Sequence, residues 1–128
     1  MRPQKTAAIT LCLFTTLVAA SGSGFKSNEE IAQANSVAPE GSSYDFALGT
    51  SMQANPKVLS GMTTCLEQSP GEQSVHGYFY FTSATQYKVE LEPRSPFSEC
   101  LEKALEGHRV PKPPEIPYFN KFNFSTAP

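Results

Sequence analysis

The stretch CLEQSPGEQSVHGYFYFTSATQYKVELEPRSPFSEC, residues 65–100, decides the fold of this 128-residue chain. It begins and ends with a cysteine, and the third cysteine, Cys12, lies in an apolar run near the N-terminus. Each of the two cysteines belongs to a run of apolar residues with helical spacing, and two strand-like runs separate them. The pattern predicts a helix, a hairpin and a second helix, with a disulfide between the helices.

The two runs between the cysteines predict an antiparallel hairpin. Residues 74–82 (SVHGYFYFT) are rich in the aromatic and β-branched side chains that favour strands. In residues 87–92 (YKVELE) apolar and polar side chains alternate, as in a strand with one face toward water. Because successive side chains of a strand point to opposite faces, Tyr78 and Tyr80 share the face opposite Phe79.

Two helices are predicted on either side of the hairpin. Asn55-Pro56 and Ser95-Pro96 each combine a favoured N-cap residue with proline at the first helical position. Apolar side chains then recur on one helical face in each run. They are Val58, Leu59, Met62, Cys65 and Leu66 in the first run, and Phe97, Cys100, Leu101, Ala104 and Leu105 in the second.

The remainder of the chain predicts a third strand and a polar linker. Prolines between residues 111 and 117 exclude a helix, and residues 118–124 carry aromatic side chains at even spacing. The predicted fold is α+β over residues 50–128, with a small antiparallel sheet packed on two helices in the order helix, strand, strand, helix, strand. Residues 21–49 are polar and predict a flexible linker, within which 28–34 fit a helical turn or two and 44–48 a short strand or turn.

The N-terminus has the layout of a secretory signal peptide. Arg2 and Lys5 precede an apolar run from Ala7 to Leu17, and small residues end at Ala20. Cleavage after residue 20 predicts a periplasmic or secreted protein without a stable membrane span. The alternative is an uncleaved anchor, although the run is short for a hydrocarbon core of about 30 Å.

Export favours a disulfide between Cys65 and Cys100, the pair that remains after cleavage. Two buried free thiols are the alternative, and the lack of CxxC or HxxxH spacing argues against a metal site. The chain has ten basic and twelve acidic residues, a net charge of −2. Loss of Arg2 and Lys5 leaves eight basic residues against twelve acidic ones, so the net charge becomes −4. With no basic cluster, nucleic acid and anionic membranes are poor candidate partners.

Nothing in the sequence indicates catalysis, a metal or a cofactor. His76 and His108 are the two histidines of the chain, and no GxSxG elbow accompanies them. Glu90 and Glu92 share a strand face, which a solvated surface explains better than an acid–base pair. Asn123 begins an N-glycosylation pattern, which is a chance match if the protein is bacterial. A non-enzymatic protein is therefore predicted, with a small secreted enzyme or inhibitor as the alternative.

Short motifs between residues 58 and 124 resemble a known family. They are Cys65 near the end of the first helix, Gly77 in the aromatic strand, Cys100-Leu101 with Lys103-Ala104-Leu105, Arg109-Val110-Pro111 with Pro113-Pro114, and Phe122 with Phe124. On these motifs the region resembles the C-terminal domain of TonB-type proteins, and looks most like the disulfide-containing AgmX/PglI C-terminal variants of myxobacteria. The resemblance implies a bacterial envelope protein that engages its partners through a sheet edge.

Two groups of residues are candidate partner-binding positions. The last strand is expected at a sheet edge, whose unpaired backbone groups can accept a partner strand. Its candidates are Tyr118, Asn120, Phe122 and Phe124. Tyr78 and Tyr80 either form a partner-binding patch or pack beneath residues 44–48. The predicted function is an exported binding or structural module with a protein partner in the cell envelope, and a tethered component like an energy transducer is a further alternative.

Overall fold

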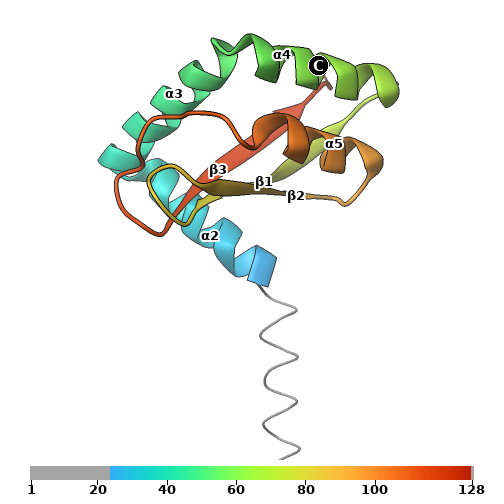
Figure 1. Ribbon diagram of the computed structural model, residues 1–128. Coiled ribbons are helices and arrows are strands. Elements are labelled where there is room, and N and C mark those ends of the chain that lie inside the picture. The colour runs from blue at the N-terminus through green and yellow to red at the C-terminus, as the bar shows by residue number, and fades with distance from the viewer. Residues whose placement is uncertain (1–23, 128) are drawn as a thin grey trace, which may run out of the picture.

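The computed structural model describes residues 24–127, which form four helices and a three-stranded antiparallel sheet (Figure 1). In chain order the elements are α2 (Gly24–Val37), α3 (Pro39–Gln53), α4 (Pro56–Gln68), β1 (Ser74–Phe81), β2 (Tyr87–Glu92), α5 (Pro96–Leu105) and β3 (Tyr118–Ser125). The mixed helix and sheet class is as predicted. The predicted signal peptide, residues 1–20, lies outside the described residues.

From residue 56 onward the predicted order of helix, strand, strand, helix, strand is confirmed. α4 begins at Pro56, and the side chain of Asn55 accepts hydrogen bonds from two backbone N–H groups of the first turn, at 2.9 and 3.4 Å. α5 begins at Pro96, where Ser95 and Ser98 form a reciprocal capping box. Both helices therefore start with a cap and a proline. The side chain of the cap accepts from an N–H group that the first turn leaves unpaired, and proline has no N–H group to leave unpaired.

β1 is the central strand of the sheet, whose order is β2-β1-β3. Phe79 lies opposite Val89 of β2 and opposite Asn120 of β3, and both pairings are antiparallel. A Cβ atom at Gly77 would lie 1.9 Å from the carbonyl oxygen of Glu90, so this position of the strand needs glycine. β2 and β3 are the two edges of the sheet, and the predicted edge position of the last strand is confirmed.

α4 and α5 cover one face of the sheet, on the same side in Figure 1. Their apolar faces and the facing strand residues form the core, in which burial of apolar surface contributes about 25 cal/mol per Å². The core contains Val58, Cys65, Phe79, Phe81, Val89, Leu91, Phe97, Leu101 and Leu105. The predicted packing of two helices on one face of the sheet is confirmed.

A disulfide joins α4 to α5, as the sequence predicted. Cys65 and Cys100 have Cα atoms 5.7 Å apart and are separated by 35 residues along the chain. Closing a loop of this length removes conformational entropy from the unfolded chain, which is worth roughly 4 kcal/mol. Since small domains unfold at a cost of about 5–15 kcal/mol, this single bond is a large part of the stability.

The opposite face of the sheet is covered by α2, in a region that was predicted to be a flexible linker (Figure 1). The linker prediction over 21–49 needs correction, because α2 and α3 occupy residues 24–53 with one residue, Ala38, between them. Tyr78 is fully buried under α2, and the ring centroids of Phe25 and Tyr78 lie 5.2 Å apart. The cover for Tyr78 is thus α2 and not residues 44–48.

Polar contacts hold α2 against the sheet, which explains why its sequence shows no apolar face. Ala32 is the one buried residue among the 14 of this helix. Asn28 donates a hydrogen bond to the Tyr78 hydroxyl at 3.1 Å, and Asn35 donates to the carbonyl oxygen of Phe119 at 2.9 Å. Apolar periodicity cannot identify a helix that docks in this way.

α3 closes the core at one end of the sheet, where the sequence suggested a short strand or turn. Tyr44, Leu48 and Met52 are spaced four residues apart and are all buried. The ring of Tyr44 packs edge-on against Tyr118, and its hydroxyl donates to the carbonyl oxygen of Pro111 at 2.6 Å. The strand prediction for 44–48 was therefore wrong, and the four-residue spacing over 44–52 is the helical signal that identifies α3.

Replacing Cys65 and Cys100 by serine should lower the free energy of unfolding by about 2–5 kcal/mol, because the unfolded chain regains the freedom that the disulfide removes. Urea unfolding of the oxidised protein and of the double variant measures the difference. The reduced wild-type protein is the control and should match the double variant. Alkylation of two thiols per native chain without reductant would contradict the disulfide.

Tyr78 should make the protein less stable at alkaline pH. Burial raises its pKa above the ordinary value, and the hydrogen bond that it donates to Glu90 adds to this shift. The folded chain therefore keeps the proton at pH values where the unfolded chain has lost it. The stability from this group is complete below about pH 10 and falls by up to about 1.4 kcal/mol per pH unit above it.

Urea unfolding between about pH 9 and about pH 12 tests this expectation. Tyr78→Phe should show a shallower decline than the wild-type protein. The decline should not vanish, because burial also raises the pKa of Tyr44, Tyr87 and Tyr118. Equal slopes for the two proteins would show that Tyr78 ionises as easily in the folded state as in the unfolded state.

Candidate partner-binding edges of the sheet

The two sheet edges are the candidate functional sites, because an edge strand turns half of its backbone N–H and C=O groups away from the sheet. Thr82 N–H donates to the carbonyl of Gln86, and Thr126 N–H donates to that of Gln73. Hydrogen-bonded and non-hydrogen-bonded residue pairs alternate along an antiparallel ladder. These two bonds therefore determine which edge residues point their backbone N–H and C=O groups away from the sheet. They are Tyr87, Val89 and Leu91 on the β2 edge, and Phe119, Lys121, Asn123 and Ser125 on the β3 edge.

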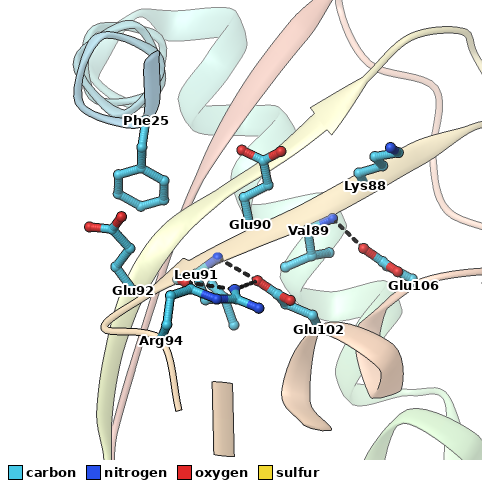
Figure 2. A pocket seen from close by; sticks show the side chains of 9 residues that line it. All are labelled: Phe25, Lys88, Val89, Glu90, Leu91, Glu92, Arg94, Glu102 and Glu106. Atoms are coloured by element: carbon cyan, nitrogen blue, oxygen red, sulfur yellow. Dashed lines mark hydrogen bonds and ion pairs between the residues drawn. The ribbon is translucent and has the colours of Figure 1, made fainter. Parts of the chain in front are cut away.

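Two carboxylates occupy the β2 edge, one from α5 and one from the residue that follows it (Figure 2). Glu102 accepts a hydrogen bond from Leu91 N–H and Glu106 accepts one from Val89 N–H, both at 2.8 Å. Four residues of helix rise about 6 Å, and two residues of strand rise about 6.6 Å. The two glutamates therefore match the spacing of the outward donors of Val89 and Leu91, and they close this part of the β2 edge.

Arg94 completes the closure of the β2 edge at Leu91. Its Nη1 atom lies 2.5 Å from Glu102 Oε2 and 3.1 Å from the carbonyl oxygen of Leu91. The hydrogen bond to Glu102 raises the pKa of Arg94, which keeps the guanidinium charged. Both outward backbone groups of Leu91 thus have partners within the chain, and a foreign strand would have to displace them.

A cavity of about 380 Å³ runs along this closed edge (Figure 2). Its charged lining residues are Lys88, Glu90, Glu92, Arg94, Glu102 and Glu106. Of the carboxylates, Glu102 and Glu106 bond the β2 backbone, and Glu90 accepts from the Tyr78 hydroxyl. Among the described residues no serine, cysteine or histidine lines the cavity. Three of the four carboxylates that line the cavity therefore form hydrogen bonds within the fold.

On the β3 edge, the outward carbonyl groups in the first half have partners, whereas the outward groups in the second half are open. Asn35 of α2 donates to the carbonyl oxygen of Phe119 at 2.9 Å, and the Asn120 side chain donates to that of Lys121 at 3.1 Å. Within residues 24–127, no group bonds the outward N–H or C=O of Asn123. The open part of the sheet edge is thus the C-terminal half of β3, whose residues are half-buried or exposed.

The six predicted partner-binding residues do not form one surface. Tyr78 and Tyr80 lie on the α2 side of the sheet, where Tyr78 is buried. The ring of Tyr80 stacks on that of Phe119, with the ring centroids 4.5 Å apart. The other four, on the opposite face, are Tyr118, Asn120, Phe122 and Phe124. Of these the first two are buried, and the last two lie half-buried against the core. What β3 offers to a partner is therefore mainly backbone.

The two histidines have structural contacts. His76 Nδ1 lies 2.5 Å from a carboxylate oxygen of Glu29 in α2. His108 Nε2 lies 2.8 Å from the carbonyl oxygen of Ala104, at the end of α5. In the part of the chain that the structure describes, no group of three or more His, Cys, Asp or Glu side chains could hold a metal ion.

Comparison of the chain with family models, with curated proteins and with solved structures finds no match. No helix within residues 24–127 is long and apolar enough to cross a membrane.

Sequence reasoning identified the β3 edge but missed the carboxylates that close the β2 edge. Glu102 and Glu106 have the spacing of a solvated helix face, and such faces are common. The signal that could have identified them is their position beside the apolar residues Leu101 and Leu105, which must face the sheet. Asn35 was missed because its helix has no apolar periodicity.

Replacing Glu102 and Glu106 by alanine should open the β2 edge. The N–H groups of Val89 and Leu91 would lose their acceptors, so each substitution should cost about 1–3 kcal/mol of folding stability. The exposed edge should then pair with that of another chain. Urea unfolding measures the stability, and size-exclusion chromatography with light scattering measures the association.

Glu99→Ala is the matched control for these variants. Glu99 is on the same helix, but its ion pair with Arg94 is long, at 3.8 Å, and its side chain is 61 % exposed. Its loss should leave stability and association unchanged, because exposed ion pairs contribute little. If the double alanine variant were monomeric and as stable as the wild-type protein, the two glutamates would not be closing the edge.

Proposed function

We propose that the chain is an exported, non-enzymatic protein-binding module of the bacterial cell envelope, and that an extended segment of its partner pairs with the β3 edge. The observation that carries this proposal is the difference between the two edges. Glu102 and Glu106 accept from two of the three outward N–H groups of β2, those of Leu91 and Val89, whereas the outward groups of Asn123 on β3 have no partner within residues 24–127. A sheet with one closed edge directs strand addition to the other.

The proposal includes a TonB-like arrangement of residues 50–128. It is supported by the order α4-β1-β2-α5-β3 and by the disulfide between the two helices. The motifs around Cys65, Gly77 and Cys100 add the resemblance in sequence. TonB-type domains engage partners at a sheet edge, so the same mode is the one that this arrangement favours here.

Export is the second part of the proposal. The layout of residues 1–20 supports it, and so does the bond between Cys65 and Cys100, because disulfides persist in oxidising compartments such as the periplasm. The proposed location is therefore periplasmic or secreted. In that setting the disulfide keeps α5, and with it the closed β2 edge, in place.

Binding at the β3 edge would rest on main-chain hydrogen bonds, with side chains selecting the partner. The half-buried rings of Phe122 and Phe124 flank the open segment and offer it some apolar surface. Lys121 lies at its start and is a common device against indiscriminate pairing of edges. The edge therefore suits one extended partner segment better than self-association.

Asn123→Pro should abolish most partner binding while the domain stays folded. The substitution removes an outward N–H group, and proline is tolerated on an edge strand when its nitrogen faces solvent. Capture of the partner should fall by about tenfold or more. The measurement is quantitative mass spectrometry of proteins from envelope extract that bind to immobilised residues 21–128.

Two further variants make this test specific. Asn123→Ala keeps the N–H group and should capture the partner as the wild-type protein does. Asn120→Pro removes an inward donor that pairs with Phe79, so it should cost about 3 kcal/mol or more of stability. Equal capture by wild-type protein and Asn123→Pro, for every bound protein, would rule out strand addition at this edge.

A further inference from the structure

A second cavity, of about 350 Å³, lies where α3 begins, against the loop that leads into β3. The residues that matter in its wall are Pro39, Glu40 and Gly41 of α3, Pro114 and Glu115 of the loop, and Tyr118 of β3. Its volume is at the lower end of the ~300–1,000 Å³ that is usual for small-molecule sites. The cavity is therefore large enough for a small ligand or one long side chain.

The Tyr118 hydroxyl is a polar group that the fold leaves without a partner. Tyr118 is 4 % exposed, and no group within residues 24–127 forms a hydrogen bond with its Oη atom. A Cβ atom at Gly41 would lie 2.8 Å from this oxygen, so the hydroxyl reaches the wall that Gly41 forms. Buried hydroxyls are nearly always hydrogen-bonded, and an unpaired one indicates a missing partner.

The charges around this cavity are carboxylates. Glu40 and Glu115 line it, and no lysine or arginine of the described residues does. Both carboxylates, together with Asp45, add to the effect of burial in raising the pKa of Tyr118, which indicates that they lie within electrostatic reach of its hydroxyl. The site is thus rich in oxygen acceptors and negative in charge.

The N-terminus of α3 does not turn the cavity into a site for anions. Ala38 provides no side-chain cap, and the unpaired N–H groups of a helix N-terminus attract anions. Glu40 in the first turn supplies a negative charge there, and Glu115 adds a second on the facing loop. An anionic ligand would meet two carboxylates, whereas a cation would be attracted to both.

We propose that this cavity binds an organic cation, an alkyl stem that ends in a guanidinium or primary ammonium group. The N–H groups of the cation donate to the carboxylates of Glu40 and Glu115 and to Tyr118 Oη, which uses the buried acceptor. The stem lies against the rings of Pro39 and Pro114, as the apolar part of a basic side chain commonly does. The cation is either a free small molecule or an arginine or lysine side chain of a protein partner.

This site does not depend on strand pairing at the β3 edge. The Tyr118 side chain belongs to the core face of the sheet, and Tyr118 pairs with Phe81 at the far end of β3 from Asn123. Loss of partner capture in Asn123→Pro should leave the cavity unchanged. The two proposals can therefore fail separately.

The test is an NMR titration of ¹⁵N-labelled residues 21–128 at low ionic strength. The probes are butylguanidinium chloride, butylammonium chloride and sodium butyrate, which share a stem and differ in charge. Either cation should produce saturable shifts of the amide signals of Glu40, Gly41 and Glu115, and butyrate should not. Absence of saturable shifts with both cations, or binding of butyrate to the same residues, would overturn the proposal.

Variants identify the groups that bind. Glu40→Gln with Glu115→Gln should weaken binding of butylguanidinium by about tenfold or more, because two charge-assisted hydrogen bonds are lost. The matched control is Glu67→Gln with Glu72→Gln, two exposed glutamates outside the cavity lining, which should bind as the wild-type protein does. Equal binding by the Glu40 and Glu115 double variant and this control would overturn the assignment.

Tyr118→Phe separates a binding role from a structural one. Its hydroxyl has no partner within the described fold, so the variant should be at least as stable as the wild-type protein in thermal unfolding. Its affinity for butylguanidinium should nevertheless fall by about threefold or more. Reduced stability with unchanged affinity would show that the hydroxyl serves the fold and not a ligand.

A peptide distinguishes the two sources of the cation. Acetyl-Gly-Arg-Gly-amide should bind about tenfold or more tightly than butylguanidinium if the site receives a basic side chain of a partner, because the peptide backbone adds contacts. Equal or weaker binding of the peptide would assign the site to a free small cation. Either result is compatible with the proposed chemistry of the cavity.

Discussion

The orientation of α5 on the sheet is the constraint on which the rest of the structure depends. Successive residues of a helix are about 100° apart around its axis, so Cys100, Leu101 and Glu102 point in three directions. Leu101 is buried against the sheet, Cys100 bonds to α4, and Glu102 reaches the backbone of β2. One rotation of the helix thus satisfies the core, the disulfide and the edge together. A rotated α5 would break all three, so each of these contacts stabilises the other two.

The two edges of the sheet differ because different kinds of element lie beside them. The β2 edge faces the helix that directly follows it, and a short connection lets Glu102 and Arg94 bond Leu91 from nearby positions in the chain. The β3 edge meets α2, which comes from the other end of the chain and contributes Asn35 to the carbonyl of Phe119. Local contacts occupy the outward donors of Val89 and Leu91 on one edge, whereas a distant helix reaches only the beginning of the other. This difference leaves the second half of β3 open.

The sequence was sufficient for the part of the fold that apolar periodicity and capping control. The helices after Asn55 and Ser95, the hairpin, the disulfide and the last strand were predicted, because the hydrophobic effect and proline chemistry leave direct patterns. α2 could not be predicted in this way, since 1 of its 14 residues is buried and the helix docks largely through the polar side chains of Asn28 and Asn35. The closed β2 edge was missed for a related reason: a glutamate that accepts from a backbone N–H looks in the sequence like any surface glutamate. Residue patterns therefore predict what is buried more readily than what is hydrogen-bonded.

The contact of α2 with β3 limits the length of the open edge. Asn35 bonds the outward carbonyl of Phe119, so a partner strand that extends along all of β3 must displace this asparagine. The cost of the exchange is moderate, because a main-chain donor of the partner would replace the lost hydrogen bond. Ala32 and Phe25 give α2 little apolar anchorage in comparison with the core beneath α4 and α5. Under the proposed strand addition, a partner segment confined to the end of β3 would bind without moving α2, whereas a longer one would compete with it. The strength of α2 docking would then determine which segments the edge accepts.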